Sequence, residues 1–240
     1  MAIALDQVAR VLLLPVLVAQ GVWLGARAMK LPEPPGPRAG MVGKGPALRL
    51  LILGDSSAAG VGAMSQDTAL SGQLTRLLAE HVHLDWHLEG ETSATTKTSL
   101  AKLSRLPDQR FDIAILIHGV NDTTRFTPQK KFHARQSALI RALHERHGVR
   151  NFVLSGVPPL RHFPLVPQPL RWVLGKHADR LDAVLADIAR ADDGVTHLPL
   201  TLPYEPRFTA IDGFHPSEAA YAVWAEMLAD VVLDQAGRRS

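Results

Sequence analysis

From residue 47 onward, short apolar runs alternate with stretches of helical periodicity, and this alternation restricts the fold more than any other feature. The strand-like runs span 48–53, 82–88, 111–117, 151–155 and 195–198. The helical stretches span 68–81, 95–106, 128–147, 171–190 and 216–235, where apolar residues recur three and four positions apart. Strands that alternate with helices are joined by right-handed crossovers into a mainly parallel sheet covered on both faces. The sequence therefore predicts an α/β domain with five strands, whose ligands bind in the loops at their carboxyl ends.

Length and composition narrow the class of protein. With 240 residues, the chain is long enough for one sizeable domain. It has no cysteine, which excludes disulfides, thiolate metal sites and a cysteine nucleophile. The net charge of +3 comes from scattered side chains and only 5% of residues are aromatic, so no nucleic-acid partner is expected. His144 and His147 lie three residues apart without a third ligand pattern, and neither a metal nor a cofactor is expected.

Residues 1–45 form a separate segment ahead of the domain at 46–240. Residues 11–26 carry no charged side chain, and the Pro-rich stretch 31–40 that follows them is typical of a linker. As a helix, residues 11–26 would reach about 24 Å, short of the roughly 30 Å hydrocarbon core of a bilayer. Three interpretations stay open: a membrane-associated anchor, a cleaved signal peptide with Ala26-Arg27-Ala28 at its end, and a helix packed on the domain. The basic residues after the apolar stretch favour a cytoplasmic location for the domain at 46–240, with export as the alternative.

The first strand-like run ends in a turn of small and polar residues, Gly54-Asp55-Ser56-Ser57. A serine at the carboxyl edge of a parallel sheet is a candidate nucleophile once a neighbouring base accepts its proton, and backbone N–H groups of the same turn can stabilise an oxyanion. A helix cap without chemistry is the other interpretation of this turn. Nucleotide binding is disfavoured because the Lys-Ser/Thr pair that ends a Walker motif is missing.

Two further polar groups fall where the chain returns to the same edge. His118-Gly119-Val120-Asn121-Asp122 follows the third run, and a side-chain amide there can donate a hydrogen bond to a developing oxyanion. Asp212 precedes His215 by three residues just ahead of the last helical stretch, so a short turn can let the carboxylate orient the imidazole as in a Ser-His-Asp system.

Taken in order, GDS, GxND and DxxH resemble the blocks of the SGNH/GDSL hydrolase superfamily over roughly residues 47–236. The resemblance implies a flavodoxin-like three-layer α/β/α sandwich with strand order 2-1-3-4-5. It also implies that Ser56 is the nucleophile, His215 the base and Asp212 the residue that orients it. The backbone N–H of Ser56 and the side chain of Asn121 would form the oxyanion hole, and Gly54, Asp55 and Gly119 match as scaffold.

The second block departs from the family pattern. Ser93 stands where the following Ala-Thr-Thr leads us to expect the glycine that donates a backbone N–H to the oxyanion, and Gly90 is the other candidate. We prefer Ser93, because a serine N–H serves equally where its backbone angles suit. The family's GDSL is GDSS here, so Ser57 is a second hydroxyl to be distinguished from Ser56.

The resemblance implies a serine esterase that hydrolyses acyl esters through an acyl-enzyme without a cofactor. Related enzymes include lysophospholipases, thioesterases, arylesterases and carbohydrate deacetylases. The apolar residues 11–26 favour lipid-like substrates and membrane association. A polysaccharide O-acetyl esterase and a catalytically silent binding domain are the alternatives.

Overall fold

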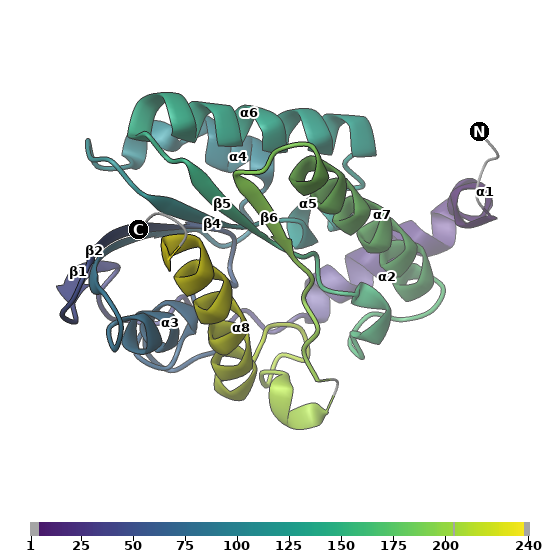
Figure 1. Cartoon of the computed structure of the whole chain (residues 1–240). Coiled ribbons are helices and arrows are strands. Elements are labelled where there is room, and N and C mark those ends of the chain that lie inside the picture. Colours follow the sequence, from purple (N-terminus) through teal and green to yellow (C-terminus); the bar gives the residue numbers. More distant parts are fainter. Residues whose placement is uncertain (1–4, 204, 238–240) are drawn as a thin grey trace.

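The computed structural model describes residues 5–203 and 205–237, which form a sheet with helices on both faces (Figure 1). Its six strands are β1 (Ala39–Val42), β2 (Ala47–Gly54), β3 (His83–Gly90), β4 (Ile113–Ile117), β5 (Asn151–Ser155) and β6 (Val195–Leu198). The strand order is β1-β3-β2-β4-β5-β6, and all neighbours are parallel except β1 and β3. Counted from β2, the parallel strands have the order 2-1-3-4-5, so the predicted three-layer flavodoxin-like fold is confirmed.

Helices cover the two faces of the sheet unequally. One face packs against α4 (Thr96–Ala101), α6 (Gln129–His147) and α7 (Leu170–Arg190), and the other against α3 (Leu70–Leu78) and α8 (Glu218–Gly237) (Figure 1). Within β2, Leu51 and Leu53 belong to the first core cluster, whereas Leu50 and Ile52 belong to the second. This division follows from the two-residue period of a strand, and it explains why residues 50–53 of β2 are apolar without interruption.

The strand β1 was not predicted, so the sheet has six strands where five were expected. It is a four-residue edge strand that is mostly exposed, and it therefore lacks the apolar pattern on which the strand predictions depended. The predicted boundary between residues 45 and 46 falls between β1 and β2, although β1 pairs with β3. The preceding Pro-rich residues are also attached, because Arg38 donates to the carbonyl of Gly90 at 2.8 Å and Glu33 accepts from the backbone N–H of Thr92 at 2.7 Å.

The N-terminal apolar segment forms two helices, α1 (Leu5–Leu12) and α2 (Leu14–Arg27), which meet at a bend of 80° and contact α7. Among the described residues no single helix has the length and apolarity to cross a membrane, whereas α1 and α2 taken together meet that test by length and composition. Leu17 is buried in the first core cluster. The segment is therefore packed on the domain, and whether it also binds a membrane remains a prediction.

Candidate active site

Ser56 lies in the turn directly after β2, at the carboxyl edge of the sheet. Its side-chain Oγ lies 2.9 Å from Nε2 of His215, and the residue is only 7% exposed. The preceding Gly54 permits a close approach of strands, since a Cβ there would lie 2.4 Å from the carbonyl oxygen of Ile117. This crowding explains why the turn begins with glycine.

His215 and Asp212 lie in a tight turn between β6 and α8. Oδ2 of Asp212 lies 2.5 Å from Nδ1 of His215, while Oδ1 accepts the backbone N–H groups of Phe214 and His215 at 3.0 Å each. The turn is closed by the backbone N–H of Ala210, which donates to the carbonyl of His215 at 2.8 Å. The backbone thus fixes the carboxylate before the imidazole binds it.

The electrostatics of this pair determine its tautomer. Burial alone would raise the pKa of Asp212, but the hydrogen bonds from the His215 side chain and from two backbone N–H groups hold that pKa below its ordinary value. An ionised carboxylate accepts hydrogen bonds only, so Nδ1 of His215 carries the proton. Nε2 is then free to accept the hydroxyl proton of Ser56, which is the arrangement that serine activation requires.

Asp55 and Ser57 flank the Ser56 position without joining this chain of hydrogen bonds. Oδ1 of Asp55 accepts the backbone N–H of Ser57 at 2.9 Å, which ties the turn together. Burial raises the pKa of Asp55 to about 6, although the bond from Ser57 opposes that shift. Ser57 is half-buried and lines the cavity described below. The hydroxyl that contacts the His215 imidazole is that of Ser56.

Gly119 and Asn121 stand at the end of β4, where the short helix α5 (Val120–Thr124) begins. Gly119 has a φ of 137°, and a Cβ there would lie 2.4 Å from the Val157 side chain, so glycine is required on both counts. Nδ2 of Asn121 donates to the carbonyl of Ala94 at 3.0 Å. The amide therefore lies beside the loop after β3. Its Nδ2 has two N–H donors, and the bond to the Ala94 carbonyl takes one of them.

The loop after β3 contains the two candidates for the second block. Ser93 has a φ of 66°, in the left-handed region that favours glycine, and its carbonyl accepts from Arg125 at 3.1 Å. Gly90 instead ends β3, where a Cβ would lie 2.6 Å from the backbone nitrogen of Ala59. Gly90 thus has a packing reason to be glycine, whereas Ser93 has a backbone conformation that favours glycine.

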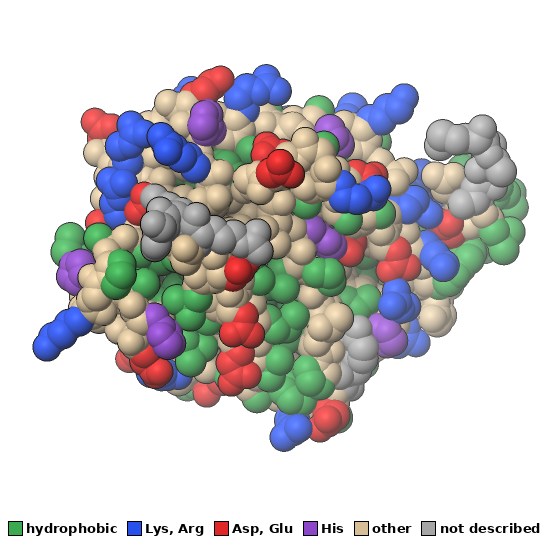
Figure 2. Space-filling view, in the orientation of Figure 1, with side chains coloured by type: hydrophobic (Ala, Val, Ile, Leu, Met, Phe, Trp, Pro, Cys, Tyr) green, Lys and Arg blue, Asp and Glu red, His purple; other side chains and the backbone are tan. Residues whose placement is uncertain are grey.

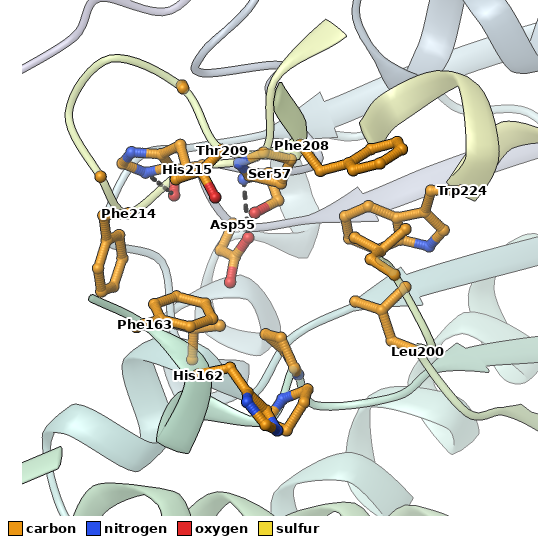
Figure 3. Close-up of a pocket in the computed structure, with 18 of the residues that line it drawn as sticks. Asp55, Ser57, His162, Phe163, Leu200, Phe208, Thr209, Phe214, His215 and Trp224 are labelled. Carbon is orange, nitrogen blue, oxygen red and sulfur yellow. Dashed lines mark hydrogen bonds between the residues drawn. The ribbon is translucent and has the colours of Figure 1, made fainter. Parts of the chain in front are cut away.

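A cavity of about 470 Å³ opens beside Ser56 and His215. Phe163, Phe214 and His215 lie on one side of it, and Leu200 and Trp224 lie opposite (Figure 3). Its walls come mainly from the loops after β5 and β6, and most of the lining side chains are apolar. Sequence reasoning placed function in these loops and noted the Pro-rich stretch 156–169, but it named none of these lining residues apart from the predicted site residues.

His118, His144 and His147 each form a hydrogen bond within the domain, with partners other than Ser56 and His215. Nε2 of His118 lies 2.8 Å from the Ser99 hydroxyl, and burial lowers the pKa of His118 to about 4, which keeps the ring neutral. Nδ1 of His144 and of His147 contact backbone carbonyls at 2.8 and 3.0 Å. Within residues 5–203 and 205–237, no group of three or more His, Asp or Glu side chains has the geometry of a metal site.

A flavodoxin-like sheet with hydrogen-bonded Ser, His and Asp at its carboxyl edge has the architecture of the SGNH class. The chain belongs to the GDSL-like lipase/acylhydrolase family, whose profile matches residues 52–223. The resemblance inferred from the sequence blocks is thereby confirmed.

Individual relatives agree with this family. The GDSL-like esterase Rv1075c of Mycobacterium tuberculosis is 29% identical over 194 residues, which are 75% of this chain and 60% of that protein. This chain thus spans about 60% of that relative's length. Two solved structures have the same fold: TesA (TM-score 0.61, 18% identity, 78% of this chain and 99% of that one) and the psychrotrophic esterase EstA from Pseudoalteromonas sp. (0.58, 18%, 79% and 98%).

Proposed function

We propose that the protein is a serine carboxylic ester hydrolase. The observation that carries the proposal is the continuous hydrogen-bonded chain from Asp212 through His215 to Ser56, at the mouth of an apolar cavity. Each bond in this chain has the direction that activates a serine hydroxyl. A silent binding domain would have no need of that direction, so the geometry argues against this alternative.

The reaction would take two steps. Oγ of Ser56 attacks the ester carbonyl carbon while its proton passes to Nε2 of His215, and the tetrahedral intermediate then expels the alcohol, which receives that proton. In the second step His215 accepts a proton from water as the water oxygen attacks the acyl-enzyme. The acid leaves, and the proton returns to Oγ of Ser56.

The developing oxyanion needs donors aimed at it. We assign this role to the backbone N–H of Ser56, the backbone N–H of Ser93 and the side-chain amide of Asn121. The left-handed backbone of Ser93 supports its assignment over Gly90, whose conformation serves strand packing. The bond from Asn121 to the Ala94 carbonyl supports a rigid amide next to the same loop.

The cavity supports a substrate with a sizeable apolar acyl group. Its volume lies within the range of ligand pockets, and its walls offer aromatic and aliphatic side chains such as Phe163, Leu200 and Trp224. An acetyl group would leave most of this space unfilled. Lipid-like esters, lysophospholipids among them, are therefore favoured over acetylated polysaccharides.

Two single substitutions test the assignment of the nucleophile. In hydrolysis of p-nitrophenyl esters from acetate to dodecanoate, Ser56→Ala should lower kcat/KM by at least about 10³-fold for every ester. Ser57→Ala is the matched control, one residue away with the same hydroxyl, and it should stay within about tenfold of wild type. Equal losses at the two positions would contradict the proposal. A preference for acetate over all longer esters would favour the acetyl esterase.

A further inference from the structure

The helices α1 and α2 present an apolar face to the outside of the molecule. The exposed side chains include Leu5, Val8, Val11, Leu12, Leu14, Val16, Val18, Val22 and Trp23, with exposed fractions from 43% to 75%. Figure 2 shows hydrophobic side chains gathered at the right edge of the surface, where Figure 1 places these helices. A contiguous exposed patch of this kind marks an interaction surface rather than an ordinary solvent face.

The opposite face of the same helices is attached to the domain. Arg180 of α7 forms two hydrogen bonds with Asp6, at 3.0 and 2.5 Å, and Asp6 is only 5% exposed. Leu17 is buried in the first core cluster, and Leu13 and Leu24 pack against that cluster. Leu17 follows Leu13 by four residues and Leu24 follows Leu17 by seven, so these three leucines share the face of α2 that packs on the domain, and the other faces of α2 are left outside.

Charge indicates what covers the exposed face. Between residues 7 and 32 the only charged side chains are Arg10, Arg27 and Lys30, all basic. The guanidinium of Arg27 lies 5.3 Å from the centre of the Trp23 ring, which places a cation and an amphipathic ring together at one end of α2. Basic residues beside an exposed tryptophan and aliphatic side chains are complementary to an anionic lipid surface.

We propose that α1 and α2 form a platform that binds in the plane of an anionic bilayer. The 14 residues of α2 extend about 21 Å, too short to span the roughly 30 Å hydrocarbon core, and α1 departs from them at 80°. Crossing the bilayer would also require the bond between Asp6 and Arg180 to break. Lying in the interface keeps this bond and buries the exposed apolar side chains.

The platform is linked to the cavity wall. The side chain of Gln20 donates to the carbonyl of Gln168 at 2.6 Å and accepts the backbone N–H of Leu170 at 3.1 Å. The same loop contains Phe163 and Pro164, which line the cavity. Resting on the proposed function, the inference is that the ester is lipid-borne and reaches Ser56 from the membrane to which the platform binds.

Co-sedimentation of the full chain with vesicles tests the platform. The wild-type protein should bind phosphatidylcholine vesicles that contain phosphatidylglycerol, and bind more weakly without it. Val22→Glu should raise the lipid concentration for half-binding at least about tenfold, equivalent to about 1.4 kcal/mol. Met41→Glu on β1 is the matched control, because Met41 and Val22 are both 68% exposed, and it should bind as wild type does.

Hydrolysis of a soluble p-nitrophenyl ester distinguishes the two proposals and reports folding. Val22→Glu should keep this activity while losing vesicle binding. Absence of esterase activity in a wild-type protein that binds vesicles would overturn the proposed function and the lipid-borne ester but leave the platform. Equal vesicle binding by Val22→Glu and wild type would overturn the platform. So would a wild-type dimer that Val22→Glu dissociates without vesicles, or a mature protein from its own cells that begins after residue 28.

Discussion

Replacing Asp212 by asparagine tests the tautomer on which the proposed mechanism depends. Oδ1 of Asp212 accepts two backbone N–H groups at 3.0 Å, so the asparagine must place its carbonyl oxygen there. Its NH₂ group is then directed at Nδ1 of His215, 2.5 Å from the present Oδ2. An amide N–H donates, so it favours the tautomer in which Nδ1 has no proton.

The magnitude of the effect follows from this reversal. With the proton on Nε2, the imidazole donates toward Oγ of Ser56 and can no longer accept its proton. Loss of the general base, with the oxyanion donors retained, should lower kcat by about 10³- to 10⁴-fold. This corresponds to about 4 to 5.5 kcal/mol in the activation free energy.

The assay is p-nitrophenyl ester hydrolysis near neutral pH, with urea unfolding of each variant to confirm the fold. Asp182→Asn is a matched control, since Oδ1 of Asp182 lies 2.9 Å from Nε2 of His197 in an Asp–His pair outside the cavity lining. It should leave kcat within about threefold of wild type. A folded Asp212→Asn enzyme with a kcat within tenfold of wild type would refute the proposed role of Asp212.

Two further predictions concern the cavity and the buried carboxyl. Leu200→Trp should shorten the cavity opposite His215, so hydrolysis of p-nitrophenyl octanoate should fall roughly tenfold or more relative to the acetate; an unchanged ratio would place the acyl group elsewhere. The pKa of Asp55 is about 6 in the folded protein against 3.8 for the free side chain, so the folded state holds this proton more tightly than the unfolded state does. The resulting contribution to the free energy of unfolding is fully present below about pH 3.8 and is lost as pH rises through 6. Urea unfolding should show Asp55→Asn gaining about 3 kcal/mol relative to wild type between about pH 3.5 and pH 7, and a constant difference would contradict the raised pKa.

The centre of the sheet could be predicted because β2, β4 and β5 are buried on both faces. Strands buried on both faces are short apolar runs, which can be recognised without knowing the neighbouring strands. The helices between them can be recognised from apolar residues three and four positions apart, which form the face that packs on the core. The predicted runs 151–155 and 195–198 have the same bounds as β5 and β6. The edge strand β1 lacks this signal. It is exposed, four residues long and held by hydrogen bonds to β3, so its side chains need not be apolar.

For the candidate site, the sequence likewise predicts one property and not another: it predicts which residues come together, but not the distances between them. Ser56, Asn121 and the Asp212-His215 pair follow strands or precede a helix, so the order of elements brings them to one edge of the sheet. Their mutual distances depend on details that the sequence does not show, such as the two backbone N–H groups that hold Asp212. The left-handed conformation of Ser93 also comes from the loop around it rather than from its residue type.

The cavity was not predictable because no local rule connects its walls. Phe163 comes from the loop after β5, Leu200 follows β6 and Trp224 lies in α8, and each is an ordinary apolar residue in its own segment. They meet only because parallel crossovers bring all three segments to the edge that holds Ser56. Reaction chemistry depends on a few residue types at positions that the strand order determines, whereas substrate choice depends on the shape that the loops enclose. On the proposed function, we expect a change of substrate in this chain to need changes in the loops after β5 and β6, with the Ser-His-Asp geometry left as it is.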